Sequence, residues 1–474
     1  KNVRFIYSWD DYDVSRKVPG NMPQPEVLEK YLRYPITMVP DTFGRDENYA
    51  RHHEVDIETQ LPRVGIHPEF LYQASRYRAN RYAEGMKKAL QNRELIKECL
   101  NEYRDEQHKM KPEDVYWPVA AFCCKCNKDE TEILDYDGEY GVTYKCKACG
   151  HEEKGDLRTS KEFKLGWRVD WPMRWNEEKV VFEPGGKDHI SPGGSYDTAK
   201  LVSKKVFGWD APVTMKYDFV KLKGVPGKMS SSKGKVISLV DALEVYQPEV
   251  LRYIFAMNKV DHEFSISFDL DVVTIYEAYD KTERIAWGID KAKNEDLFLK
   301  EKRIYELSQI ENGMPKVQPY QIAFRLLTTL LQTYSGDIDA VIASLKDVKE
   351  EQKETLRRRC ECAWYWIKES APDCAPDFCF TLREDGSKAE DISGEMLTAV
   401  RRVRDEVVPR LETFAVDKEC QQAMYDIATE LGLESKALFT ALYHALIGKD
   451  QGPRLASFFR IIGKEKLQKI LSVY

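Results

Sequence analysis

A short basic segment, Lys228-Met229-Ser230-Ser231-Ser232-Lys233-Gly234-Lys235, combines cations, hydroxyl groups and a flexible glycine. Lys223 and Gly224 precede it. A triphosphate needs such groups, because its negative charge must be spread over cations, hydroxyl donors and free backbone N–H groups. A run of this composition on its own is usually a solvated basic loop. The segment therefore indicates a nucleotide site only where the residues around it support one.

Two tight pairs of cysteines indicate a metal site. Five of the eleven cysteines lie between Cys123 and Cys149, and nineteen residues separate the two Cys-x-x-Cys pairs. Such pairs on opposing knuckles can supply four thiolates in a tetrahedron, which suits zinc. Four protein ligands leave no open position, so the predicted role is structural. The predicted ligands are Cys123, Cys126, Cys146 and Cys149, with Cys124 and His151 as alternatives.

A glycine-rich turn, Pro184-Gly185-Gly186-Lys187-Asp188-His189, follows the apolar run 179–183 and precedes a helix predicted over 196–207. Strand, glycine loop and helix form the unit from which parallel α/β sheets are built. Pro-Gly-Gly is turn chemistry in any protein. It is the position between a strand and a helix that favours a binding function.

At 474 residues, the chain is long enough for two or three domains. Its 42% of apolar and 32% of charged residues are ordinary for a soluble globular protein. Because the net charge is −7, any nucleic-acid surface must be a local basic patch. The sequence has no apolar run that spans a bilayer and no signal-peptide pattern, and the scattered remaining cysteines favour a reducing compartment. We therefore expect a cytoplasmic protein that does not enter a membrane.

Hydrophobic periodicity predicts the elements that position these groups. The run 3–7 is expected to be a core strand, and residues 72–107 are expected to be helical. Residues 163–171 and 179–183 are predicted strands. Beyond residue 270, apolar residues recur at three- and four-residue steps, which predicts an all-α region.

The segment from Tyr217 to Phe268 resembles the region around the KMSKS loop of class I aminoacyl-tRNA synthetases, and the likeness is greatest to the class I lysyl-tRNA synthetases. The run Gly185–His189 resembles the nucleotide loop of that family. The run Leu438–Gly448, followed by Gly452-Pro453-Arg454-Leu455, resembles the helical cage that binds the anticodon in lysyl- and glutamyl-type enzymes. The resemblance covers nearly the whole chain.

This resemblance implies a Rossmann-like α/β catalytic domain over residues 1–235, with the zinc insert at 117–157. A stem-contact region is expected at 236–300 and an α-helical anticodon-binding region at 301–474. It also implies the reaction: lysine attacks the α-phosphate of ATP, pyrophosphate leaves, and tRNA(Lys) accepts the lysyl group. The expected cofactors are ATP, Mg²⁺ and structural Zn²⁺. The oligomeric state does not follow from the sequence.

The same resemblance assigns roles within the basic segment. Lys228 is expected to stabilise the departing pyrophosphate, because a fixed cation offsets the charge that develops there. Ser231 occupies the fourth position, where the family often has a second lysine, so Lys233 is the expected substitute. The residues expected to bind ATP are Gly185, Gly186, Asp188, Lys228, Met229, Ser230, Ser231 and Ser232, with Asp188 accepting from the ribose hydroxyls.

A lysine substrate needs walls for its methylene stem and an acceptor for its ammonium group. Trp167, His189 and Tyr217 resemble the residues that line the family's amino-acid pocket. Taken alone, a tryptophan in a strand is more often a core residue. The candidate ammonium acceptors are Asp170 and the acidic loop Asp10, Asp11 and Asp13.

Two features of the family are missing from the sequence. None of the eight histidines begins a His-x-Gly motif, and the resemblance places that motif before Lys1, so we expect a truncated chain with little or no activity of its own. A second metal site is not expected near Asp41–Asp46, because Arg45 stands where a soft ligand is needed.

The tRNA contacts and the substrate have alternatives. Arginines beside tryptophans are candidate phosphate and stacking contacts, although solvated helix faces are as common. These candidates are Arg357, Arg358, Arg359, Trp364, Trp366, Arg401, Arg402 and Arg404. The rival functions are another class I synthetase, glutamyl or arginyl, and a tRNA- or RNA-binding paralogue without catalysis.

Overall fold

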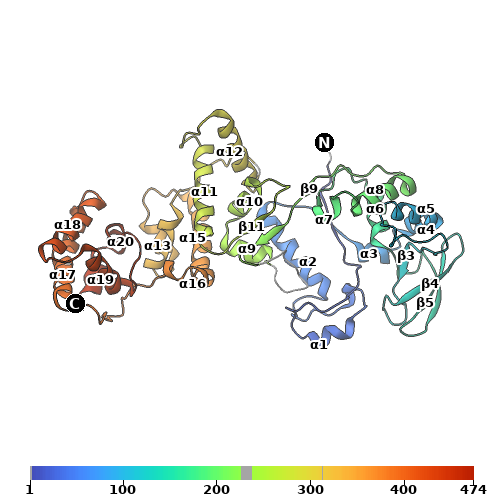
Figure 1. Ribbon diagram of the computed structural model, residues 1–474, viewed down its shortest axis with the longest axis horizontal. Coiled ribbons are helices and arrows are strands. Elements are labelled where there is room, and N and C mark those ends of the chain that lie inside the picture. The colour runs from blue at the N-terminus through green and yellow to red at the C-terminus, as the bar shows by residue number, and fades with distance from the viewer. Residues whose placement is uncertain (1–2, 226–236, 312) are drawn as a thin grey trace. The chain divides into compact units, whose positions relative to one another are not determined.

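The computed structural model describes residues 3–225, 237–311 and 313–474 and divides the chain into two compact units (Figure 1). The first unit comprises Lys1–Leu239 and Asn258–Ile266, and the second comprises Val240–Met257 and Ser267–Tyr474. The boundaries predicted at 235 and 300 stay predictions.

The first unit mixes strands and helices. Its strands are β1 (Ile6–Trp9), β2 (Glu69–Tyr72), β3 (Val119–Ala121), β4 (Thr131–Tyr136), β5 (Gly141–Cys146), β6 (Glu152–Asp156), β7 (Phe163–Leu165), β8 (Gly185–Gly186), β9 (Lys216–Tyr217), β10 (Val220–Leu222) and β11 (Phe264–Ile266). Its helices are α1 (Pro25–Leu28), α2 (Tyr49–Gln60), α3 (Gln73–Arg78), α4 (Ala83–Gln91), α5 (Arg93–Asn101), α6 (Trp167–Glu178), α7 (Lys187–Ile190) and α8 (Ser195–Val202).

Three of its sheets are parallel pairs, β1 with β2, β8 with β9 and β10 with β11. Parallel neighbours need a crossover between them, and helices such as α2 and α8 lie in those connections. This is the α/β construction expected from the strand–glycine–helix pattern. Among the described residues, the parallel strands form separate two-stranded pairs, each with only two to four residues in register.

The cysteine-rich insert has its own antiparallel sheet of order β4-β5-β6, and β3 pairs with β7 at its base. Tyr144 and Val142 of β5 are fully buried, as are Leu157 and Leu165. Figure 1 shows β3, β4 and β5 beside the helices α4 and α5. The insert therefore has a core that holds its knuckles in place.

Two predicted strands are wrong. The strand that begins at Phe163 ends at Leu165, and the extended Gly166 starts helix α6 at Trp167. Val169 and Met173 are buried four residues apart, as one face of a helix requires. In the run 179–183, only Phe182 makes a parallel bridge, with Val213.

The N-terminal strand is shifted from its predicted place. It covers Ile6–Trp9 rather than residues 3–7, and Val3 and Phe5 are exposed. The helical prediction for residues 72–107 is confirmed for α3, α4 and α5, but Glu69–Tyr72 before them is the strand β2. The helix predicted over 196–207 is confirmed as α8 followed by a π-helical turn at Ser203–Phe207.

The second unit is helical, as the periodicity beyond residue 270 predicts. Its helices are α9 (Leu239–Val245), α10 (Pro248–Met257), α11 (Asp271–Ala286), α12 (Glu295–Ser308), α13 (Phe324–Thr333), α14 (Ile338–Ser344), α15 (Lys353–Tyr365), α16 (Ala371–Cys374), α17 (Gly394–Arg402), α18 (Asp417–Glu430), α19 (Ser435–Ile447), α20 (Leu455–Ile462) and α21 (Lys464–Leu471). A separate core between Leu382 and Tyr474 joins α17 to α21. Within the described part of the chain, no helix has the length and apolarity to cross a membrane.

Candidate functional site

Three predicted pocket residues lie together in the first unit. Trp167 opens helix α6, and its ring centroid is 6.0 Å from that of His189 on α7. Tyr217 on β9 pairs in register with Gly186, which directly precedes α7. Trp167 is 50% exposed and Tyr217 is 45% exposed, so neither is a core residue. We call Trp167, His189 and Tyr217 the aromatic wall. The rings of Trp167 and His189 are neighbours, and the ring of Tyr217 lies against Gly186, where a built Cβ would be 3.5 Å from it.

The glycine loop is shaped by close approach. A Cβ on Gly185 would lie 2.4 Å from the side chain of Ile190, and one on Gly194 would lie 2.5 Å from the carbonyl oxygen of His189. The second contact is with backbone, which cannot move aside, so a side chain at Gly194 would displace the turn. His189 Nδ1 lies 2.7 Å from the hydroxyl of Ser195, which fixes the ring. The loop therefore presents its backbone and the His189 ring in one defined arrangement.

Asp188 and its neighbour differ in their surroundings. Asp188 lies in the first turn of α7. The adjacent Lys187 pairs with Asp218 at 2.6 Å, and the hydrogen bond to Asp218 raises the pKa of Lys187. Lys187 is therefore held beside the end of β9, which Asp218 follows directly. The role of Asp188 as an acceptor from the ribose hydroxyls stays a prediction.

Asp170 lies in the first turn of α6, the helix that Trp167 opens, and its carboxylate already has partners. Its Oδ1 accepts a hydrogen bond from the buried Tyr77 hydroxyl, and its Oδ2 pairs with Arg174 at 3.0 Å. Burial raises the pKa of Asp170, and the charge of Arg174 opposes that shift. Both oxygens have partners, so the role of Asp170 as an ammonium acceptor stays a prediction that the geometry does not favour.

Arg174 connects the buried carboxylate to the acidic loop. It also pairs with Asp10 at 2.8 Å, and Asp10 is largely exposed. Asp11 is buried and accepts from the backbone N–H of Ala74 at 2.8 Å. The sequence analysis missed Arg174, although its spacing of four residues from Asp170 would bring the two together on a helix.

The basic segment Lys228–Lys235 lies outside the described residues. The roles predicted for Lys228, Met229, Ser230, Ser231, Ser232 and Lys233 therefore stay predictions.

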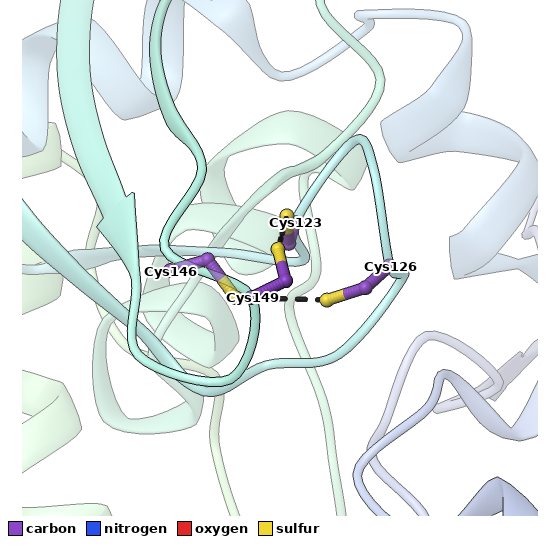
Figure 2. Close-up of side chains that lie close together, drawn as sticks. All are labelled: Cys123, Cys126, Cys146 and Cys149. Atoms are coloured by element: carbon purple, nitrogen blue, oxygen red, sulfur yellow. Dashed lines mark hydrogen bonds between the residues drawn. The ribbon is translucent and has the colours of Figure 1, made fainter.

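The four predicted zinc ligands converge, as Figure 2 shows. The sulfur of Cys123 is 3.7 Å from that of Cys149, and the sulfur of Cys126 is 3.6 Å from that of Cys146. A tetrahedron of thiolates with zinc–sulfur bonds of about 2.3 Å has edges of about 3.8 Å. All four sulfur atoms lie within 4.8 Å of one another, so the set fits a zinc ion.

The local electrostatics differ within this set. Burial raises the pKa of Cys123 to about 12. The pKa of Cys149 is instead lowered to about 7, mainly by a hydrogen bond from the backbone N–H of His151. The alternatives Cys124 and His151 lie in another group with Glu153. The geometry favours the two cysteine pairs as one set of four, and their role as zinc ligands stays a prediction.

Arg45 lies in the segment Asp41–Asp46, for which the sequence analysis does not expect a metal site. Its guanidinium pairs with Asp46 and Asp56, each at 2.6 Å, and donates to the carbonyl of His52. Asp41 accepts backbone N–H groups from Phe43, Arg45 and Asp46, and its pKa is lowered to about 2 by these bonds despite the opposing effect of burial. These carboxylates have protein partners, but Asp41, Asp46 and His52 also lie close enough together to hold a metal ion, so the absence of a second site stays a prediction.

Two of the candidate tRNA contacts are wrong. Arg359 is buried and pairs with Asp280 at 2.7 Å, and Trp366 is fully buried with its ring N–H donating to the carbonyl of Phe268. Both are core residues of the second unit, because the spacing that placed them on a helix did not show which face is covered. Arg402 and Arg404 are on the surface and pair with neighbouring carboxylates.

Comparison with known proteins covers almost the whole chain. The family model for tRNA synthetases of class I (K) matches residues 1–311, and that for an anticodon binding domain matches residues 377–471. A protein from Treponema pallidum named lysine–tRNA ligase is 54% identical over 100% of this chain and 88% of its own length. One of the same name from Thermococcus kodakarensis is 41% identical over 99% and 89%. A solved glutamate tRNA ligase from Elizabethkingia meningosepticum covers 90% of each chain at 15% identity, with a TM-score of 0.38 that supports no argument.

Proposed function

This chain belongs to the tRNA synthetases of class I (K), and we propose that it is a lysine–tRNA ligase that activates lysine with ATP and transfers it to tRNA(Lys). The observation that carries the substrate assignment is the half-exposed aromatic wall of Trp167, His189 and Tyr217. Flat rings offer contact area to a methylene stem and an attractive face to an ammonium group.

The wall and the nucleotide loop are continuous, which suits a reaction between the carboxylate of lysine and the phosphates of ATP. Gly186 pairs with Tyr217, and the chain passes directly into Lys187 and Asp188. Lysine held on the wall would have its carboxylate beside ATP held on Gly185 and Gly186. Placing the two reactants in contact is itself a large part of the rate enhancement.

The charged groups complete the proposed chemistry. Lys228 offsets the charge on the departing pyrophosphate, and Lys233 assists it. Mg²⁺ bound with ATP supplies further positive charge to the phosphates. Asp188 accepts from the ribose hydroxyls, and Asp10, which accepts from Arg174 through Oδ1 but is largely exposed, is the proposed ammonium acceptor.

The four-cysteine cluster is proposed to hold one zinc ion that only stabilises the insert. Its four sulfur atoms leave no position for a substrate. The helices between Leu382 and Tyr474 are proposed to bind the anticodon, which the family match over residues 377–471 supports. The cytoplasm is the proposed location.

Amino-acid-dependent ATP–pyrophosphate exchange on the full-length protein tests this function. Exchange is expected with lysine and at background level with glutamate or arginine. Arginine presents a broad planar guanidinium, and glutamate would bring a second carboxylate to the acidic loop. Exchange driven by glutamate or arginine would replace the lysine assignment with one of these rivals. Absence of exchange with all three, with tRNA binding intact, would favour the paralogue without catalysis.

A further inference from the structure

A second group of metal-binding side chains lies beside the zinc cluster. Cys124 follows Cys123 directly, while His151 directly precedes β6 and Glu153 is the second residue of that strand. The sulfur of Cys124 is 3.3 Å from His151 Nε2, and the carboxylate Oε2 of Glu153 is 3.2 Å from the same nitrogen. The three donor atoms lie within 4.8 Å of one another. We call these three residues the Cys124 cluster.

The orientation of the imidazole distinguishes a metal site from a nucleophile with its base. In a catalytic triad the two ring nitrogens face different partners, one the nucleophile and the other the carboxylate. Here a single nitrogen, His151 Nε2, faces both the sulfur of Cys124 and the oxygen of Glu153. A ring nitrogen has one lone pair or one hydrogen to offer, so it cannot serve both well. Three donors that face one point are the arrangement of ligands around a cation.

The distances also fit a cation. With bonds of about 2.3 Å to sulfur, about 2.05 Å to nitrogen and about 2.1 Å to oxygen, a tetrahedral zinc ion holds sulfur and nitrogen about 3.6 Å apart and nitrogen and oxygen about 3.4 Å apart. The observed 3.3 Å and 3.2 Å are each within a few tenths of an ångström of these values. A small outward movement of the side chains would therefore admit the ion.

The backbone around the cluster is held in place independently of any ion. The N–H of Cys124 donates to the hydroxyl of the buried Tyr144 at 2.9 Å, and Tyr144 pairs in register with Glu153 across β5 and β6. The carbonyl of His151 accepts the N–H of Cys146 at 2.7 Å. This hydrogen bond continues the β5–β6 ladder by one residue, so His151 and Glu153, two residues apart, project from the same side of it. All three donors are thus fixed by one small sheet.

We propose that the Cys124 cluster is a second metal site, separate from the four-cysteine site, that takes a divalent transition cation such as Zn²⁺. One sulfur, one imidazole and one carboxylate suit such a cation, whereas Mg²⁺ and Ca²⁺ prefer oxygen ligands alone. Thiolate and carboxylate together offset the two charges of the ion. Cys124 is exposed, so the fourth position is open to solvent or to a ligand.

Cobalt titration of the full-length protein, loaded beforehand with one equivalent of zinc so that only the four-cysteine site is filled, tests the proposal, with zinc release measured in parallel. The wild-type protein is expected to bind about one Co²⁺ with a thiolate-to-cobalt absorption band while keeping its zinc. Cys124→Ser should weaken this binding by more than the about 10–100-fold that loss of an outer-shell partner causes. Cys374→Ser, which removes another exposed cysteine outside the insert, should bind cobalt like the wild type.

The further variants Glu153→Gln and His151→Ala should also lose cobalt and keep zinc. Zinc retention shows that the insert is folded, so a loss of cobalt binding cannot be ascribed to unfolding. The proposal is overturned if the wild type that carries one equivalent of zinc takes up no cobalt without releasing zinc, or if Cys124→Ser binds cobalt equally well. Loss of the first zinc in Cys124→Ser would also overturn it, because Cys124 would then belong to a single shared site.

Discussion

Replacing Asp170 by Asn separates a structural role from a substrate-binding role. Asp170 is buried, with 8% of its surface exposed, and its carboxylate pairs with Arg174 at 3.0 Å. Breaking a buried ion pair by removing one charge costs about 3–5 kcal/mol. Arg174 keeps Asp10 at 2.8 Å, and Asn retains an acceptor for Tyr77, so the expected loss is at the lower end, about 3 kcal/mol.

Urea unfolding followed by tryptophan fluorescence measures this loss, because Trp167, Trp171 and Trp175 share helix α6 with Asp170. Tyr77→Phe is the matched variant. It removes only the hydroxyl that Asp170 accepts, so its expected loss is smaller, about 1–2 kcal/mol. Calorimetric titration with lysine at a temperature where both variants are folded should show nearly unchanged affinity.

The opposite pattern would refute this reasoning. If Asp170→Asn unfolds at the wild-type urea concentration but binds lysine about 100-fold more weakly, the carboxylate faces the substrate. That loss would be about 2.7 kcal/mol of binding free energy. The network of Tyr77 and Arg174 would then be an arrangement that lysine displaces.

Four further predictions follow from the site and the second unit. Cys146→Ser should lose zinc and expose residues 117–157 to proteolysis while the helical unit stays protected; metal-free wild type after gentle purification would contradict this. Lys228→Ala should lower kcat for adenylate formation by about 10²–10³, and a raised lysine KM with unchanged kcat would remove the phosphate assignment. Trp167→Ala should weaken lysine binding and leave ATP affinity unchanged, which equilibrium dialysis of each ligand measures. His444 donates to Asp450 and Asp391, and these bonds raise its pKa above 6.5 although burial opposes them. The stability that these bonds contribute is therefore present below about pH 6.5 and is lost as the pH rises through the raised pKa. His444→Gln should lower the melting temperature at pH 6 but hardly at pH 9.

The parts of the fold that depend on short-range spacing were predictable. Two Cys-x-x-Cys pairs imply knuckles whatever lies between them, and the helical period beyond residue 270 is sustained over many turns. The structure of residues 163–171 was not predictable in this way. Tryptophan and valine favour strands, whereas the burial of Val169 and Met173 selects a helix from Trp167 onward. Local preference and tertiary burial disagree there, and burial decides.

The candidate site was predictable only in part. Trp167, His189 and Tyr217 were expected in one pocket by resemblance. The structure places the rings of Trp167 and His189 near each other and pairs Tyr217 with Gly186, and their role in binding lysine stays a prediction. The partners of Asp170 were missed, because Tyr77 lies 93 residues away and no local pattern connects the two. Arg359 was assigned to RNA because sequence alone does not show which face of a helix is covered.

Arg45 gives the loop around Asp41 a permanent internal counter-ion. A guanidinium stays protonated at every pH a cell meets and cannot be removed by a chelator or replaced by a competing metal. The link that Arg45 makes between Asp46 and Asp56 of helix α2 therefore needs no metal ion, whereas the cysteine insert of the same unit is expected to depend on one. Under zinc starvation the cysteine insert is therefore expected to unfold while the ion pairs of Arg45 remain in place.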